Sequence, residues 1–228
     1  MLLLGSDNSV VQKILANNKA WSESQAKTDP SYFKNAIKGQ NPSIVYIGCS
    51  DSRVATDLVT GSHPGEIFTH RNIANSVTIN DNDTLAVLQY AIEHLKIKDI
   101  VVSGHTYCGG IGAVINGFEE LGGALEDWLT PIKTMYDDNK KFFDKIKDPY
   151  QKSRALTEMN VERVVNLVND LDFIKDARKS GQVVRIHGLI YLMETGRFVD
   201  LGLTQTKNSV RLILTNFGKK KIKKSSHH

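Results

Sequence analysis

The stretch Ser43-Ile44-Val45-Tyr46-Ile47-Gly48-Cys49-Ser50-Asp51-Ser52-Arg53 decides the fold. Its first part is a run of β-branched and aromatic residues between Pro42 and Gly48, which is typical of a short buried strand. The polar residues from Cys49 to Arg53 follow the end of that strand. In an open α/β sheet, ligands bind at the carboxyl ends of the strands. This stretch therefore predicts a buried central strand with a binding site at its end.

A second strand end carries the other cysteine of the chain. The apolar run Ile100-Val101-Val102 leads into Gly-His-Thr-Tyr-Cys-Gly-Gly, which contains His105 and Cys108. With Cys49, these residues offer two sulfurs and one imidazole, a ligand set that suits zinc with a fourth position left open for water. Ordinary core packing is the alternative for His105 and Cys108 taken alone, and a redox pair is the alternative for the two cysteines. The chain has no CxxC spacing that would support a redox pair.

Further strand and helix patterns alternate along the chain. Strand patterns cover residues 66–70, 183–191 and 198–201, and residues 210–214 are a candidate last edge strand. Helical patterns cover residues 54–58, 83–95, 109–117, 125–147 and 154–171. This order predicts an α/β fold with a mostly parallel central sheet of about four parallel strands plus an antiparallel edge strand, flanked by helices.

The pattern divides the chain into three regions. Residues 1–38 form an N-terminal helical arm, residues 39–217 form the α/β domain, and residues 218–228 form a basic tail. The arm has apolar residues at mostly helical spacing but no strand, so its apolar face needs another surface, which a partner subunit would supply. The tail is expected to be disordered or partly a remnant of cloning.

Composition excludes several classes of protein. The 228 residues carry a formal net charge of +4, but five lysines of the tail account for it, so no nucleic-acid partner is expected. Two cysteines do not make a disulfide scaffold and indicate a reducing compartment or metal use. The sequence contains no apolar run of about 18 residues, so no membrane span is predicted. The cytoplasm is the expected location, and a mitochondrial one stays open although no transit peptide is evident.

Three motifs of the chain resemble the signature stretches of the β-class carbonic anhydrases. They are CSDSR at 49–53, FTHRNIAN at 68–75 and GHTYCGG at 104–110, in the order and spacing of that family. The resemblance also takes in HGLIYLMETGRFVDL at 187–201. It therefore covers most of the chain.

The resemblance implies a zinc lyase that hydrates CO2 reversibly to bicarbonate. Cys49, His105 and Cys108 would hold one zinc ion per subunit, whose bound hydroxide attacks CO2. Asp51 would accept a hydrogen bond from that hydroxide and Arg53 would keep Asp51 ionised. An ordinary turn salt bridge is the alternative for this pair. The resemblance also implies a homodimer or homotetramer in which the N-terminal helices embrace a neighbour.

Some members of the family close the zinc site with their aspartate at lower pH. They have a bicarbonate pocket lined by a tryptophan, an arginine and a tyrosine. Arg71 and Tyr191 match two of these positions, but Tyr46 stands where the tryptophan would be. The open form, with Asp51 on Arg53 and not on zinc, is therefore favoured.

Further positions match the substrate-binding pattern of the family. Gln40 and Gly109 would contact substrate oxygen, and Phe68 and Tyr90 would line the CO2 pocket. His94 matches a proton-shuttle position, which suits a group that titrates near neutral pH. Plain packing is the alternative for Phe68 and Tyr90, a tight turn for Gly109, and a solvated histidine for His94.

Two rival functions remain at this point. Hydrolysis of carbonyl sulfide or carbon disulfide would use the same site on a similar linear molecule. A non-catalytic zinc or thiol-sensing module would instead keep a closed coordination sphere. The presence of Asp51, Arg53 and Gln40 disfavours the sensing module.

Overall fold

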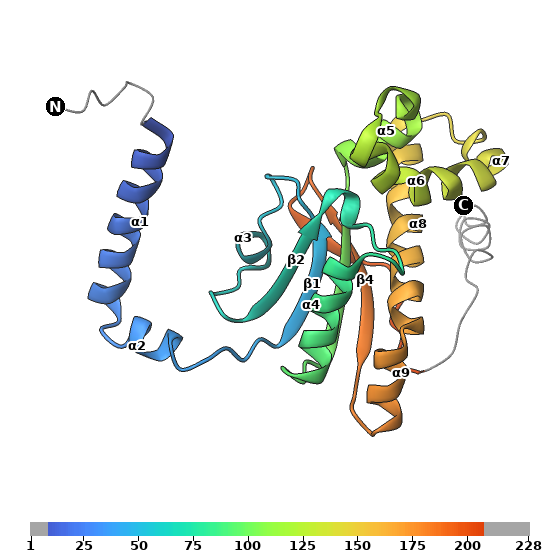
Figure 1. Ribbon diagram of the computed structural model, residues 1–228. Helices are drawn as coiled ribbons and strands as arrows, with labels where there is room; N and C mark the ends of the chain where they lie inside the picture. Colours follow the sequence, from blue (N-terminus) through green and yellow to red (C-terminus); the bar gives the residue numbers. More distant parts are fainter. Residues whose placement is uncertain (1–8, 208–228) are drawn as a thin grey trace, which may run out of the picture. The chain divides into compact units, whose positions relative to one another are not determined.

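The computed structural model describes residues 9–207. The chain divides into two units, residues 1–41 and residues 42–228, each of which is described by itself. Figure 1 shows the helices and strands of both units. Within residues 9–207, none of the helices is long and apolar enough to cross a membrane.

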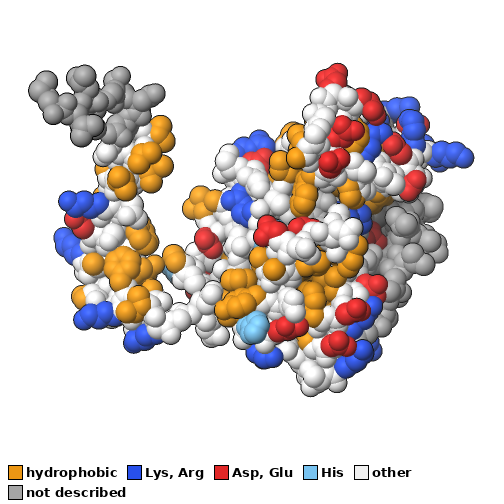
Figure 2. All heavy atoms as spheres, viewed as in Figure 1, with side chains coloured by type: hydrophobic (Ala, Val, Ile, Leu, Met, Phe, Trp, Pro, Cys, Tyr) orange, Lys and Arg blue, Asp and Glu red, His pale blue; other side chains and the backbone are white. Residues whose placement is uncertain are grey.

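The first unit consists of two helices, α1 (Ser9–Thr28) and α2 (Tyr32–Ala36). The rings of Trp21, Tyr32 and Phe33 hold their junction together by edge-to-face packing, with centroids 5.0 to 6.2 Å apart. Hydrophobic side chains lie along the exposed surface of α1 (Figure 2). More than half of the surface is exposed for Val10, Val11, Ile14 and Leu15. This unit confirms the predicted helical arm.

The second unit is a sheet flanked by helices. Its strands, within the described residues, are β1 (Ile44–Cys49), β2 (Ile67–Asn72), β3 (Asp99–His105), β4 (Arg185–Leu192) and β5 (Arg197–Asp200). Its helices are α3 (Thr56–Thr60), α4 (Asn82–Glu93), α5 (Gly109–Asn116), α6 (Gly123–Asp138), α7 (Lys140–Phe143), α8 (Pro149–Asp170) and α9 (Asp172–Lys179). Short 3-10 turns are η1 (Ile73–Asn75) and η2 (Phe118–Glu120).

The strands lie in the order β2-β1-β3-β4-β5. The first four strands are parallel, and β5 is antiparallel to β4. Because β1 and β3 are direct neighbours, their carboxyl ends meet at one edge of the sheet. The sheet confirms the predicted fold class.

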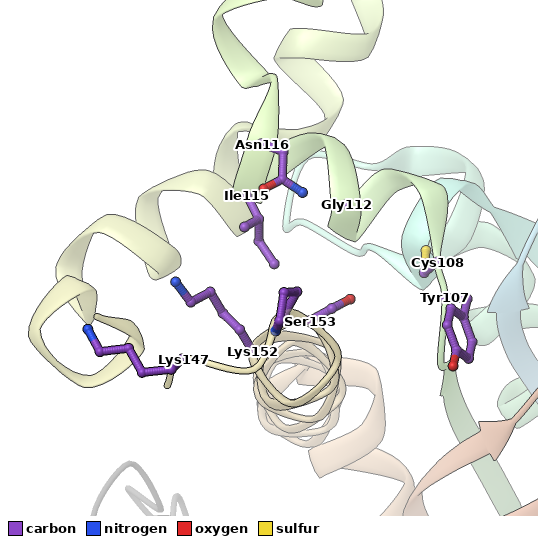
Figure 3. A pocket seen from close by; sticks show the side chains of 9 residues that line it. Tyr107, Cys108, Gly112, Ile115, Asn116, Lys147, Lys152 and Ser153 are labelled. Atoms are coloured by element: carbon purple, nitrogen blue, oxygen red, sulfur yellow. The ribbon is translucent and has the colours of Figure 1, made fainter. Parts of the chain in front are cut away.

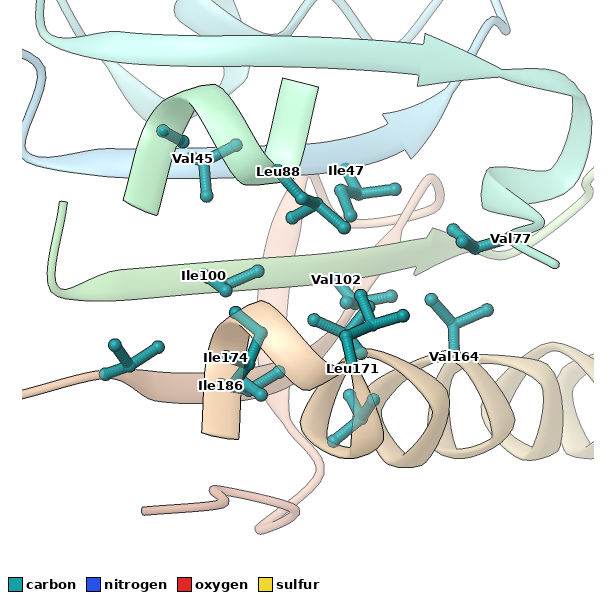
Figure 4. Close-up of a cluster of buried hydrophobic side chains, with 14 of the residues drawn as sticks. Val45, Ile47, Val77, Leu88, Ile100, Val102, Val164, Leu171, Ile174 and Ile186 are labelled. Carbon is teal, nitrogen blue, oxygen red and sulfur yellow. The ribbon is translucent and has the colours of Figure 1, made fainter. Parts of the chain in front are cut away.

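One face of the sheet packs against α4, α8 and α9. Successive side chains of a strand alternate between the two faces, so Val45 and Ile47 of β1 reach this core together with Ile100 and Val102 of β3. Figure 4 shows them against helix side chains that include Leu88, Val164 and Ile174. Each side chain of this kind contributes about 1.5 to 3 kcal/mol when it is fully buried. This cluster is therefore the main stabilising core.

A second apolar cluster lies at the carboxyl ends of β1 and β3. It contains Cys49 and Cys108 together with buried side chains of the helices α5 to α8. These side chains include Ile111, Leu129, Phe143 and Leu156. The polar residues that follow β1 and β3 therefore lie beside a buried apolar cluster.

The helix expected over residues 125–147 is interrupted. Asn139 has φ −108° and ψ 19°, which ends α6, and its side-chain amide donates to the carbonyl oxygen of Met135 at 2.9 Å. An asparagine that bonds the backbone in this way competes with helical hydrogen bonding. The expectation of one continuous helix was wrong for this reason.

The helix expected over residues 154–171 begins earlier, at Pro149. Proline suits the first helical position because that position needs no N–H donor. The carboxylate of Asp148 accepts the backbone N–H of Tyr150 at 2.9 Å and caps the helix. The candidate strand 210–214 lies outside the described residues.

Candidate metal centre

Two neighbouring parallel strands bring the three candidate metal ligands together. β1 ends at Cys49 and β3 ends at His105, with Ile47 opposite Val102 in the register. Cys108 follows a short turn and precedes the first residue of α5. The Sγ atoms of the two cysteines are 3.9 Å apart. The donor atoms of all three residues lie within 4.8 Å of one another.

His105 presents one free ring nitrogen to this cluster. Its Nδ1 is 2.8 Å from the carbonyl oxygen of Thr106, and it carries the proton because a carbonyl only accepts. The lone pair is therefore on Nε2, which is buried and has no hydrogen-bond partner among the described residues. A buried imidazole nitrogen whose ring is oriented through its other nitrogen fits a metal ligand.

The two cysteine sulfurs need a cation before both can be ionised. The two sulfurs share one hydrogen bond, which lowers the pKa of the Cys49 thiol and raises the pKa of the Cys108 thiol, so only one of them is readily ionised. The backbone N–H groups of Asp51 and Ala74 also lower the pKa of Cys49 and so favour its thiolate. Two thiolates at this separation repel each other, and a divalent cation offsets both charges. The donor set fits zinc.

Asp51 lies beside the ligand cluster and is held by Arg53. Its Oδ1 accepts from Arg53 Nε at 3.0 Å and its Oδ2 accepts from Arg53 Nη2 at 2.7 Å. The same Nη2 donates to the carbonyl oxygen of Tyr107 at 3.2 Å. The Arg53 guanidinium holds the pKa of the Asp51 carboxyl well below its usual range. The ionised Oδ2 is 3.8 Å from His105 Nε2.

Arg71 holds the backbone that follows β1. Its Nε donates to the carbonyl oxygen of Cys49 at 2.8 Å, and its Nη2 donates to the carbonyl oxygen of Asp51. The Arg71 guanidinium, which the family resemblance matched to a bicarbonate pocket, is thus hydrogen-bonded to the main chain. Sequence reasoning missed this role, because a contact between a side chain and a distant carbonyl leaves no periodic signal.

A hydrogen-bonded group lies behind the turn between His105 and Cys108. Thr106 Oγ1 donates to Glu194 Oε2 at 2.7 Å and accepts the backbone N–H of Met193 at 2.9 Å. The hydroxyl of Tyr150 donates to the other carboxylate oxygen of Glu194. These bonds tie the ligand-bearing turn to α8 and to the turn between β4 and β5. The sequence around Glu194 indicated only a turn.

A pocket of about 350 Å³ adjoins this turn. Figure 3 shows Tyr107 and Cys108 at one end and Lys147 and Lys152 at the other. The Tyr107 ring is 56% exposed and lies 5.5 Å from the ring of Tyr150. The Tyr107 ring narrows the end of the pocket that lies nearest Cys108.

The structure does not bring Phe68, Tyr90 and His94 to the ligands of their own chain. Phe68 pairs with Val45, four residues before Cys49, which is about 13 Å along a strand. The Tyr90 ring is 5.8 Å from that of Phe68 and 5.1 Å from that of His94. The three rings therefore form a separate cluster on β2 and α4.

Gly109 and Gln40 lie in different surroundings. Gly109 is the first residue of α5, and a Cβ added there would have no described atom within 4 Å. Its backbone is therefore open to approach. Gln40 is exposed and belongs to the first unit. The substrate roles of both residues remain predictions, as do those of Phe68, Tyr90 and His94.

Comparison with known proteins gives a consistent result. The carbonic anhydrase family model matches residues 44–198. A carbonic anhydrase of Emericella nidulans is 36% identical over 191 residues, which cover 84% of this chain and 83% of that protein. A carbonic anhydrase of Saccharomyces cerevisiae is 34% identical, with 84% and 88% covered. A β-carbonic anhydrase from Sordaria macrospora, described as tetrameric, superposes with a TM-score of 0.82 at 35% identity, covering 86% of this chain and 98% of that one.

A mostly parallel sheet with a buried Cys-His-Cys group at its strand ends places the chain among α/β proteins with a candidate metal centre. Within that class, the chain belongs to the β-class carbonic anhydrases. It is an enzyme of the carbonate dehydratase type. The resemblance identified from the three sequence motifs is confirmed.

Proposed function

We propose that this chain hydrates CO2 reversibly to bicarbonate and a proton with one zinc ion held by Cys49, His105 and Cys108. The observation that carries the proposal is the convergence of three buried donor atoms within 4.8 Å. Bound there, zinc would supply the Lewis acidity that makes water a nucleophile near neutral pH. No disulfide competes with this role, because both cysteines are free thiols.

Asp51 orients the attacking oxygen. An ionised carboxylate only accepts hydrogen bonds, so Asp51 would accept a hydrogen bond from the hydroxyl group that attacks CO2. A lone pair of that oxygen then faces the carbon atom. The paired bonds from Arg53 support this role because they fix both carboxylate oxygens. They also keep Asp51 from acting as a fourth ligand, and we infer the open, constitutively active form.

The substrate contacts extend beyond the ligand cluster. We assign the Gly109 N–H and the Gln40 side chain to the substrate oxygens, and the open space beside Gly109 supports the first assignment. Phe68 and Tyr90 would supply an apolar lining. Both residues lie far from the metal ligands of their own chain. They can therefore line a substrate site only if a second copy of the chain brings them to its metal ligands.

An oligomer is therefore part of the proposal. The exposed apolar side chains of α1 and the tetrameric relative from Sordaria macrospora support a homodimer or homotetramer. Sedimentation equilibrium of the full chain tests this, and a monomer at micromolar concentration would contradict it. We propose the cytoplasm as the location, with the mitochondrion as the alternative because one relative, from Arabidopsis thaliana, is named as mitochondrial.

The metal content of purified protein tests the assignment of the ligands. Elemental analysis should give one zinc per chain for the wild type and almost none for Cys49→Ser, in which a weak hydroxyl ligand replaces the thiolate. Full zinc content in Cys49→Ser would contradict the ligand set. If zinc is bound but CO2 is not hydrated, carbonyl sulfide and carbon disulfide are the next substrates to test. Failure with all three would favour a zinc or thiol-sensing role.

A further inference from the structure

The turn η1, between β2 and α4, has a strained backbone. Ala74 has φ 59° and ψ 26°, and Asn75 has φ 44°. Both residues are buried, with 0% and 2% of their surface exposed. Left-handed backbone costs free energy in most residues other than glycine, so Ala74 is strained although asparagine tolerates this conformation. Two such residues in succession persist only where the surrounding structure holds them.

This turn contacts the segments that carry both cysteines. Ala74 lies in the same buried cluster as Cys49 and Cys108. A Cβ added to Gly110 would lie 3.2 Å from the Cβ of Ala74, so the turn packs tightly against the start of α5, just after Cys108. The position of Ala74 therefore sets the packing around both sulfurs.

Two side chains of α8 hold this turn in place. Asn160 Nδ2 donates to the carbonyl oxygen of Ala74 at 2.9 Å. Arg163 Nη1 donates to the carbonyl oxygen of Val77 at 2.9 Å, and its Nη2 donates to Ser76 Oγ at 3.0 Å. Arg163 also donates to Asn160 Oδ1 through Nε at 3.1 Å and Nη2 at 3.0 Å. Because Oδ1 is occupied in this way, the Asn160 amide can present only its N–H groups to Ala74.

We propose that Asn160 and Arg163 are positioning residues of the metal centre. They hold the left-handed turn that packs against Cys49 and against the start of α5, next to Cys108. The inference rests on the proposed function, because it takes Cys49 to be a metal ligand. Neither side chain touches the reacting atoms, so their effect reaches the metal through the turn. Loss of such outer contacts weakens metal affinity by about 10- to 100-fold.

Zinc affinity, measured by competition with a chromophoric chelator, tests this inference on the full chain. Asn160→Asp keeps an acceptor for Arg163 but replaces the N–H donor with an oxygen that faces the Ala74 carbonyl. Arg163→Lys keeps the positive charge but loses the planar fork of donors. Val168→Ala is the control, because it leaves a cavity in the same helix, in the main core and away from the turn. Urea unfolding of each metal-depleted variant records its stability.

We expect Asn160→Asp to weaken zinc binding by about tenfold or more, with a smaller loss in Arg163→Lys. The absorption bands of the cobalt-substituted variants should shift, since the packing around both sulfurs changes. Val168→Ala should lose stability and keep its zinc affinity. Wild-type affinity in both folded variants would overturn the inference, as would equal affinity losses in all three. A wild type that binds no zinc would instead overturn the proposed function. If Asn160→Asp does not fold, Arg163→Lys decides alone.

Discussion

The Sγ atoms of Cys49 and Cys108 are 3.9 Å apart although 59 positions separate them in the sequence. The pairing of β1 with β3 causes this approach, because parallel neighbours end at the same edge of the sheet. The left-handed turn before α4 then packs against the segments of both cysteines. The geometry of the candidate metal centre is thus set by the order of the strands.

Asp51→Asn should lower kcat/KM for CO2 hydration by about 10²-fold, the scale seen when one oriented polar contact to a reacting group is lost. The amide removes the charge that fixes the proton of the attacking oxygen, while the three ligands stay. The measurement is the initial hydration rate at matched zinc content. Asp57→Asn, on the exposed surface of α3, is the control and should retain wild-type activity. Equal rates in Asp51→Asn and the wild type would remove Asp51 from the mechanism.

His94→Ala should lower the rate by about tenfold or more in dilute buffer, because an exposed imidazole beside Tyr90 would no longer pass protons to solvent. Concentrated imidazole buffer should restore the rate. The control is His63→Ala, which removes an exposed histidine from a turn. A variant that is equally slow in dilute and concentrated buffer would show that His94 is not a shuttle.

The sequence could predict the structural features that leave a periodic pattern of apolar residues. The run before Cys49 and the spacing of Leu85, Leu88, Ile92 and Leu95 gave β1 and α4, because burial repeats with the period of each element. Two polar strand ends indicated the ligand cluster. The strained turn at Ala74 had no such signal, because neither Ala74 nor Asn75 is a glycine.

The residues that hold the site could not be predicted either. Asn160 bonds a carbonyl 86 positions away in the sequence, and Arg71 bonds two others. Such contacts depend on the packing of distant segments and not on local periodicity. The substrate contacts proposed for Phe68 and Tyr90 would likewise depend on a neighbouring chain, which the pattern within one chain cannot place.

Glu162→Met should stabilise the protein by about 1 kcal/mol or more at pH 7. Glu162 is 4% exposed, and neither carboxylate oxygen has a partner among the described residues. Burial raises the pKa of this carboxyl above its ordinary 4.5. Such a group destabilises the folded state as the pH rises above the unfolded pKa, and not below it. The gain in urea-unfolding free energy should therefore shrink toward pH 4.5. The control is Glu158→Met, one helical turn before Glu162. It breaks the ion pair between Glu158 and Arg154 and should not stabilise the protein. A constant gain at every pH would contradict this explanation.

Lys96→Gly should stabilise the protein by about 1 kcal/mol, because Lys96 has φ 55° just after the C-terminus of α4 and glycine adopts that backbone without strain. Lys98→Gly is the matched control. Lys98 is also exposed but is not among the residues with positive φ, so glycine there should destabilise. Thermal unfolding compares the two, and a similar loss in both would show that the left-handed position carries no strain.

The pH dependence of CO2 hydration by zinc-quantified protein tests the central claim most directly. Stopped-flow rates would be recorded from about pH 6.5 to about pH 9 for the wild type and for Cys49→Ala. We predict rapid hydration at neutral pH, rising on the alkaline side and lost in Cys49→Ala. Activity that begins only above about pH 8 would contradict the open Asp51–Arg53 arrangement, and a wild type that binds zinc but hydrates no CO2 at any pH would contradict the proposed function itself.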